Sequence, residues 1–168
     1  MLTKDDMNEN PTSKISQFIP IPVHSGEDRF GDHHGLGISH IDFKVTAQDN
    51  PNLFILENTF HHKGGPARHL HTDQDEWFYV IEGEFVFEVG QVRMRLQPGD
   101  SLLGPRNVPH VWAFDGDALG RILVAFTPAG KMEAFFREVT KINAMPMQDP
   151  ELWRAYEMEL LGPPLQVG

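Results

Sequence analysis

The feature that most constrains this chain is a series of short apolar segments separated by turn-forming residues. Gly, Pro, Asn and Asp recur between these segments throughout the central part of the sequence. Many short strands with regular turn signals are typical of an antiparallel β-sandwich or β-barrel. The expected strands cover residues 38–45, 53–60, 76–81, 84–89, 92–96, 101–103, 110–114 and 121–127. We therefore predict an all-β fold.

One pair of these segments shows the two-residue period clearly. Apolar and polar residues alternate on both sides of Gly90-Gln91, in segments 84–89 and 92–96. Such alternation about a short turn predicts a β-hairpin with one face toward solvent.

The hydrophobic period changes after Pro128-Ala129-Gly130. Apolar residues then recur at helical spacing: Met132, Phe135, Phe136 and Val139. This pattern predicts an amphipathic helix over 131–141. A second helix is expected to begin with Asp149 as its cap and Pro150 at its first position, and to run to about Leu161. We expect both helices to pack outside the β-domain.

The length of 168 residues suits a single domain. Residues 1–17 are polar and are expected to form a flexible N-terminal arm. Residues 18–130 should form the β-barrel, and 131–168 a C-terminal helical extension. A barrel of this size exposes an apolar sheet edge or face, so we expect a homodimer.

The composition excludes several classes of function. The net charge is −10, with 24 acidic and 14 basic residues, and offers no basic stripe for nucleic acid. No apolar run is long enough to span a bilayer, and the N-terminus has no signal-peptide core. We expect a cytoplasmic protein with a small-molecule substrate. There is no Cys, so a bound metal must use nitrogen and oxygen ligands.

Three histidines and one glutamate stand out as metal ligands. His69 and His71 are two apart, so on a strand both side chains point to the same face. Glu76 begins the next predicted strand, and a short 72–75 connection that folds back would bring it close to the pair. His110 begins another strand after Pro109. Buried ionisable groups among apolar strands need a partner or a metal, which favours a metal site.

The spacing of these residues resembles the two motifs of the cupin family. The first runs from Gly64 through His69, His71 and Glu76 to Gly83, and the second from Gly99 through Pro105 to His110. Asn107 stands where the family usually has Gly, and Phe114 where it often has Asn. The tail 161–165 is similar to that of single-domain bacterial cupins related to quercetin dioxygenases. The resemblance implies a cupin-type antiparallel β-barrel, or jelly roll, with the two helices at its C-terminus.

The resemblance also implies what the site does. His69, His71, Glu76 and His110 would hold one divalent transition metal: Fe, Mn, Ni, Co or Zn. A dioxygenase-type oxidoreductase is the leading hypothesis, with an oxygen-chelating substrate such as a flavonol, catechol or β-diketone. Glu76 is the expected catalytic base. The alternatives are a metal-dependent isomerase or lyase, and a non-catalytic metal or small-molecule binding protein.

The other candidate residues receive less specific interpretations. Trp112 and Phe114 share the face of His110, so we assign both to the substrate pocket. Arg68 is expected to point away from the metal and to pair with an acidic neighbour. The remaining histidines are expected on the surface or in loops: His24, His33, His34, His40, His61 and His62.

Overall fold

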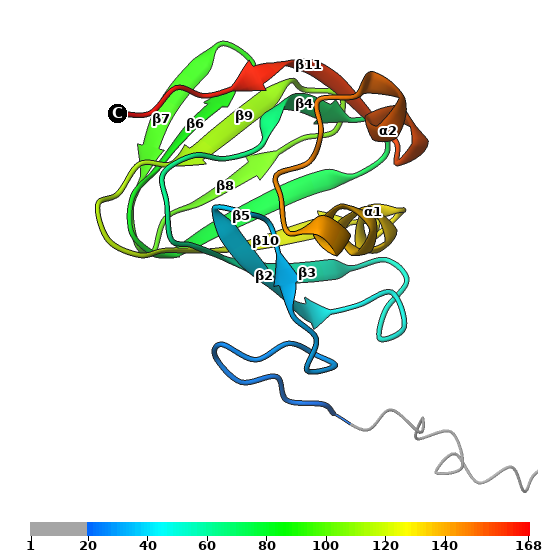
Figure 1. Ribbon diagram of the computed structural model, residues 1–168. Coiled ribbons are helices and arrows are strands. Elements are labelled where there is room, and N and C mark those ends of the chain that lie inside the picture. Colours follow the sequence, from blue (N-terminus) through cyan, green and yellow to red (C-terminus); the bar gives the residue numbers. More distant parts are fainter. Residues whose placement is uncertain (1–19) are drawn as a thin grey trace, which may run out of the picture.

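A computed structural model describes residues 20–168 (Figure 1). The predicted arm, residues 1–17, lies outside the described residues. The strands are β1 (His34–Gly35), β2 (Ser39–Val45), β3 (Phe54–Phe60), β4 (Ala67–His71), β5 (Asp75–Glu82), β6 (Phe85–Val89), β7 (Val92–Leu96), β8 (Ser101–Gly104), β9 (His110–Phe114), β10 (Gly120–Thr127) and β11 (Met158–Pro164). The helices are α1 (Met132–Val139), the 3₁₀-helix η2 (Thr140–Ile142) and α2 (Pro150–Ala155).

The strands form two antiparallel sheets that face each other. One sheet has the order β1-β2-β3-β10-β5-β8, and the other has the order β11-β4-β9-β6-β7. The expected antiparallel jelly roll is confirmed, although the sheets remain two separate ladders rather than one closed barrel. The β6–β7 hairpin pairs Val89 with Val92 around Gly90-Gln91, as the alternation predicted.

The core fills the space between the sheets with aromatic rings. Phe60 on one sheet packs edge to face on Trp112 of the other, with ring centroids 5.6 Å apart. Gly65 enters this region so closely that a Cβ there would lie 2.0 Å from the carbonyl oxygen of Trp112. The sheets are therefore held together by ring contacts and by a glycine that admits no side chain.

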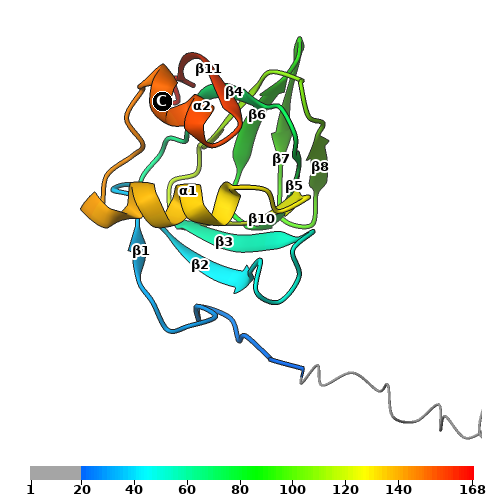
Figure 2. The same ribbon diagram turned by 90° about the vertical axis from the view of Figure 1, so that its right-hand side faces the viewer.

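The helices cover one open side of the sandwich. Figure 2 looks onto that side and shows α1 beside β3 and β10, with α2 beside β4 and β11. Helix α1 confirms the prediction of a helix after Gly130 and buries Met132, Phe135 and Val139. Its apolar stripe packs into the gap between the sheets rather than on their outer surfaces.

The second helix is much shorter than predicted. Asp149 caps α2 through the N–H of Glu151, and Pro150 is its first residue, as expected. The helix ends at Ala155, and Glu157 adopts a left-handed φ of 64°. The prediction that it continues to about Leu161 is wrong.

The residues beyond α2 form β11 instead. This strand pairs antiparallel with β4, with Met158 opposite His71 and Leu160 opposite His69. Pairing with a free sheet edge satisfies backbone groups of both strands, and Pro163 and Pro164 cannot continue a helix. The segment 131–168 is therefore not wholly helical, because its end completes a sheet.

Candidate metal centre

The four predicted ligands come from three strands in two sheets. His69 and His71 lie on β4 and His110 on the neighbouring β9, where His69 pairs with His110 across the ladder. Glu76 lies on β5, in the opposite sheet. The link between β4 and β5 is thus a crossing from one sheet to the other, and it places the carboxylate opposite the histidines.

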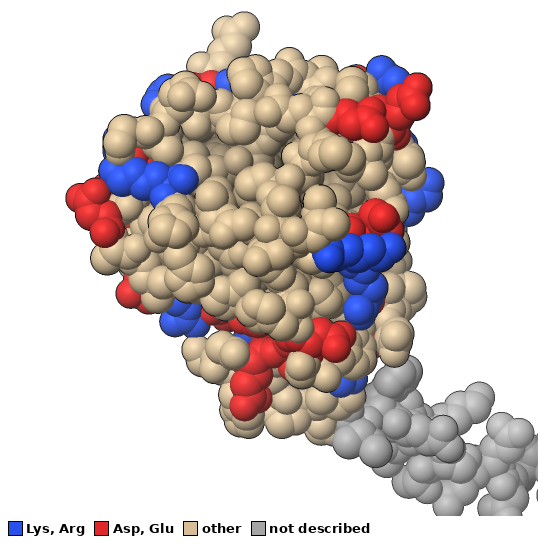
Figure 3. Space-filling model, in the orientation of Figure 1, with Lys and Arg blue, Asp and Glu red and all other residues tan. Residues whose placement is uncertain are grey.

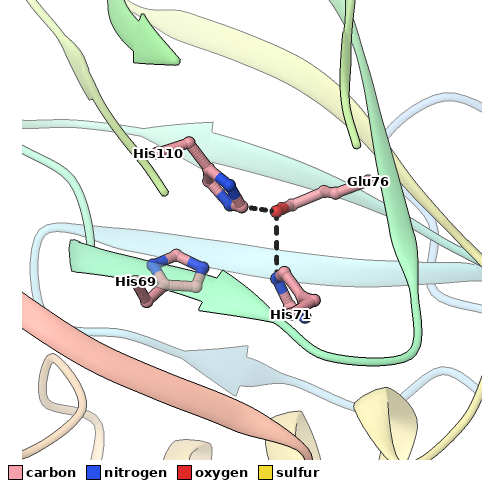
Figure 4. A group of neighbouring side chains, drawn as sticks. All are labelled: His69, His71, Glu76 and His110. Carbon is pink, nitrogen blue, oxygen red and sulfur yellow. Dashed lines mark hydrogen bonds and ion pairs between the residues drawn. The ribbon is translucent and has the colours of Figure 1, made fainter. Parts of the chain in front are cut away.

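The structure brings all four side chains to one point. One nitrogen or oxygen of each lies within 4.8 Å of the corresponding atom of the others, and all four residues are buried. Glu76 Oε2 is 3.1 Å from His71 Nε2 and 2.9 Å from His110 Nε2 (Figure 4). The site therefore has the compactness that a single ion requires.

Backbone carbonyls orient two of the imidazoles. The Nδ1–H of His69 donates to the carbonyl oxygen of Ala67 at 2.7 Å, and that of His110 donates to Val108 at 3.0 Å. With Nδ1 occupied as a donor, the lone pair of Nε2 is left to face the centre of the group. Such outer hydrogen bonds usually fix the tautomer and ring angle of metal-binding histidines.

Burial and mutual contact shift the acidities of the group. Burial, together with the nearby His110 and His71, holds the pKa of His69 well below its usual value, so this imidazole is neutral at physiological pH. Burial favours the neutral form of Glu76, yet hydrogen bonds from His110 and His71 hold its pKa well below the usual range. Burial lowers the pKa of His110, but contact with Glu76 outweighs it and raises the value. A neutral His69 beside an ionised Glu76 offers a nitrogen lone pair and a negative charge, both of which attract a cation.

These residues fit a divalent metal ion. Donors at right angles and about 2.1 Å from an ion lie about 3.0 Å from each other. The two contacts of Glu76, 2.9 and 3.1 Å, match that spacing. Nitrogen and oxygen donors of this kind suit Fe, Mn, Co, Ni or Zn.

The unusual residue of the second motif has a structural explanation. Asn107 has a φ of 61°, in the left-handed region that glycine adopts most easily. Asn tolerates this region better than most other residues. Its N–H donates to the carbonyl oxygen of His71 at 2.7 Å, which ties the loop before His110 to the strand of the first motif.

A pocket opens from the metal ligands toward the surface. It has a cavity volume of about 50 Å³, and His69, His71 and Glu76 line its inner part. Met145 and Pro146, from the segment between α1 and α2, lie at its half-exposed end. Figure 3 shows that the molecular face crossed by this segment has an uncharged centre, with charged side chains toward its margin.

The two aromatic residues assigned to the pocket occupy different places. Trp112 lines it. Phe114 is buried in the core beside Phe60 and Phe85 and does not line this pocket. Both share the inward face of β9, but Phe114 lies farther along the strand from His110.

Sequence reasoning missed most of the pocket wall. Phe135 and Phe136 of α1 and Trp153 of α2 line it, and the Trp153 ring lies 5.0 Å from that of His69. The apolar stripe of α1 was visible in the sequence. Nothing in the stripe showed which cavity it would cover.

The remaining charged and histidine side chains follow the predictions with one exception. Arg68 pairs with Glu88, away from the metal ligands, as expected. His24, His33, His61 and His62 are exposed, and His40 is half-buried. His34 is buried, which corrects its assignment to the surface: it stacks on Phe43 with centroids 4.2 Å apart.

A second group of possible metal ligands contains His34 with Asp28 and Asp32. The Asp28 carboxylate accepts the backbone N–H groups of Phe30, Asp32 and Phe43. Its oxygens therefore already serve to hold the loop, and this group is a structural cluster.

Comparison with known proteins agrees with the two motifs and the fold. A family model described as a cupin domain matches residues 57–126, which contain all four ligands. The matched part of the chain is therefore a cupin domain. No curated protein matches it.

Solved structures of cupins share the fold. KdgF from Halomonas sp. is 22% identical in sequence to this chain and matches it with a TM-score of 0.52. The matched region covers 58% of this chain and 86% of the KdgF chain. An RmlC-like cupin from Shewanella frigidimarina is 26% identical and has a TM-score of 0.51; the matched region covers 61% of this chain and 87% of that cupin. An oxalate decarboxylase from Bacillus subtilis is 17% identical and has a TM-score of 0.51; the matched region covers 58% of this chain and 27% of the decarboxylase.

Among residues 20–168, no helix is long and apolar enough to cross a membrane. The cytoplasmic location and the homodimer stay predictions.

Proposed function

We propose that this cupin is a metal-dependent oxidoreductase of the dioxygenase type. Its substrate would be a small organic molecule that chelates the metal through oxygen atoms, such as a flavonol, a catechol or a β-diketone. The observation that supports the proposal is the buried set of His69, His71, Glu76 and His110 at the inner end of an apolar pocket. Apolar pockets with a few convergent polar groups are the usual form of small-molecule sites.

The protein side chains have distinct tasks in this proposal. A bound divalent transition metal would supply Lewis acidity and, where it is redox-active, electron transfer. His69 and His110 present Nε2 atoms whose direction the carbonyls of Ala67 and Val108 fix. The aromatic wall excludes water, which strengthens electrostatic interactions at the site and protects reactive species.

Glu76 is also proposed as the catalytic base. Its pKa, held low by His71 and His110, makes it a good cation ligand and a weak base. Accepting a proton from substrate therefore requires one of these two contacts to be lost when substrate binds. The role predicts that Glu76→Gln lowers the rate of turnover more than it weakens substrate binding.

The metal is tested first. Protein purified without chelators should carry up to one divalent transition metal per chain by elemental analysis. His71→Ala and His110→Ala should each lower the occupancy strongly, whereas His61→Ala, at an exposed position, should leave it unchanged. Full occupancy in both ligand variants would refute the assignment.

Turnover is tested next. Protein reconstituted without oxygen with Fe(II), Mn(II), Co(II) or Ni(II) should consume oxygen when mixed with a member of a flavonol, catechol and β-diketone panel. Isomerisation of sugars or hydroxyketones without oxygen uptake would favour an isomerase or lyase. Binding of metal and ligand with no turnover would favour a binding protein.

We also propose a homodimer. The outer face of the β5–β8 region carries exposed apolar residues: Trp77, Tyr79 and Leu103. Trp77 pairs with Leu103 across the ladder and stacks on Tyr79 with centroids 5.9 Å apart. Contiguous exposed apolar groups of this kind are common at protein interfaces.

A further inference from the structure

The pocket above the metal ligands has no positive side chain. Among the described residues that line it, none is Lys or Arg, and Glu76 is the single carboxylate. The nearby arginines are engaged elsewhere: Arg68 pairs with Glu88 and Arg121 with Glu57. A ligand that enters this pocket finds no cationic partner away from the metal.

The charge of the ligand follows from this composition. A divalent ion with three neutral imidazoles and one carboxylate has a net charge of +1. One deprotonated oxygen of a ligand brings the centre to neutrality. A second negative charge would lie among apolar side chains without a partner, which is strongly unfavourable. The pocket therefore accepts at most one negative charge, at the metal end.

Three polar atoms in the pocket wall have no partner. Ser39 Oγ, Asn58 Oδ1 and Trp112 Nε1 are buried and form no hydrogen bond within the described part of the chain. All three residues line the pocket, and none is a metal ligand. Buried polar groups are nearly always paired, so three unpaired ones in one pocket require an explanation. We call Ser39, Asn58 and Trp112 the distal polar group.

The distal polar group lies away from Glu76. Phe126 on β10 lies opposite Glu76 of β5 and opposite Phe54 of β3, so Glu76 and Phe54 are at the same level of the sheet. Asn58 is four residues farther along β3 than Phe54. At about 3.3 Å per residue, Asn58 is about 13 Å along the sheet from the level of Glu76.

The other two members lie near Asn58. Ser39 pairs with Phe60, two residues beyond Asn58 on β3. The Phe60 ring contacts the Trp112 ring of the opposite sheet. Ser39 and Asn58 thus lie at one end of the pocket. Trp112, two residues along β9 from His110, faces that end through its contact with Phe60.

We propose that Ser39, Asn58 and Trp112 form a hydrogen-bonding subsite for the end of the ligand remote from the metal. The ligand class is an uncharged or singly deprotonated aromatic molecule, with oxygen donors at one end of its ring system and a neutral hydroxyl or carbonyl group at the other. This inference rests on the proposed metal site and deepens the proposed function. The side chains supply both donors and acceptors, since a hydroxyl and an amide can act as either and an indole N–H donates.

Binding to the zinc-loaded protein tests the subsite without turnover. Three probes share one chelating end and differ at the other: 4-ethylcatechol, 4-(2-hydroxyethyl)catechol and 3,4-dihydroxyphenylacetate. Calorimetric titration without oxygen should show the hydroxyethyl compound binding about tenfold more tightly than the ethyl compound, as a net hydrogen bond to buried partners allows. The carboxylate should bind at least about tenfold more weakly than the hydroxyethyl compound.

Variants assign the preference to the three side chains. Ser39→Ala, Asn58→Leu and Trp112→Phe should each reduce the hydroxyethyl preference, and the Ser39→Ala/Asn58→Leu double variant should reduce it to within about twofold. Binding of 4-ethylcatechol should change little. Ser101→Ala, at an exposed serine on β8, is the matched control and should retain the preference.

Stability gives an independent readout. Replacing an unpaired buried amide by an apolar group of similar shape is neutral or stabilising, whereas removing a structural hydrogen bond is destabilising. Asn58→Leu should therefore melt at the wild-type temperature or about 2–4 °C above it. A clear fall in its melting temperature would indicate a structural role and overturn the proposal.

The remaining outcomes separate this inference from the proposed function. A preference that survives in the double variant, equal binding of the carboxylate and hydroxyethyl probes, or no binding of any probe would each overturn the subsite. If the preference behaves as expected and no redox-active metal supports oxygen uptake, the subsite stands and the dioxygenase proposal fails.

Discussion

Replacing Trp153 by Ala is expected to be among the most damaging changes outside the metal ligands. Trp153 is only 2% exposed, and its ring lies 5.0 Å from His69 and 5.6 Å from Phe135. Its indole N–H donates to the carbonyl oxygen of Met147 at 2.8 Å. One side chain thus joins α2, α1 and the strand that carries two of the candidate metal ligands.

The expected cost follows from these contacts. Truncating a buried Trp to Ala costs about 3–5 kcal/mol through lost burial and the cavity that remains. For a chain of this length, each kcal/mol of lost stability lowers the melting temperature by about 2–4 °C. The melting temperature of Trp153→Ala should therefore lie roughly 6–20 °C below that of the wild type. Trp153→Phe keeps an aromatic ring and loses the hydrogen bond, so it should lose only about 1–2 kcal/mol.

Urea unfolding followed by circular dichroism measures the difference. Metal-free protein should be used, so that metal binding does not add to the apparent stability. The matched control is Ile142→Ala, because Ile142 is 70% exposed and its truncation should cost about 1 kcal/mol or less. If Trp153→Ala were no more destabilising than Ile142→Ala, α2 would not cover the pocket as described.

Three further predictions test other parts of the molecule. Gly65→Ala places a Cβ 2.0 Å from the carbonyl oxygen of Trp112 and 2.9 Å from the Cα of Ala113, so it should cost at least about 1–3 kcal/mol; an unchanged melting temperature would contradict the close approach. The hydrogen bond from Arg106 lowers the pKa of Asp75 to about 2, so the pair stabilises the fold above about pH 4 and loses this effect as the pH falls through about 2. Asp75→Asn should therefore lower the free energy of unfolding by at most about 1 kcal/mol at neutral pH, because the ion pair is exposed. The difference in stability between the variant and the wild type should vanish near pH 2. A stability difference that does not change with pH would contradict this assignment. Light scattering at micromolar concentration should give a dimer mass, and a monomer mass would refute the proposed homodimer.

The sequence predicted the parts of the fold that depend on local pattern. Alternation fixes which face of a strand is buried, and Gly90-Gln91 marks a turn, so the β6–β7 hairpin was found with its pairing. The cluster of candidate metal ligands was predicted for a similar reason. His69 and His71 must share a face of a strand whatever lies around them.

Contacts between distant segments were not predictable in the same way. Leu152, Tyr156 and Leu160 have helical spacing, yet Leu160 pairs with His69 in a sheet because the edge of β4 is available. His34 lies in a polar stretch that reads as surface, but the chain folds it over Phe43. Phe114 shares the face of His110 and still lies outside the pocket, since a shared face does not fix distance along the strand.

The pairing of β4 with β11 separates the candidate ligands from the side chain that covers them. The strand that carries His69 and His71 lies between β9 and β11. All four candidate ligands precede β11 in the sequence, and Met158 pairs with His71 from 87 residues away. Contacts between such distant segments form slowly, because the long loop between them must first close. The ligands can therefore assemble before β11 pairs, whereas the cover that Trp153 places over His69 depends on that pairing.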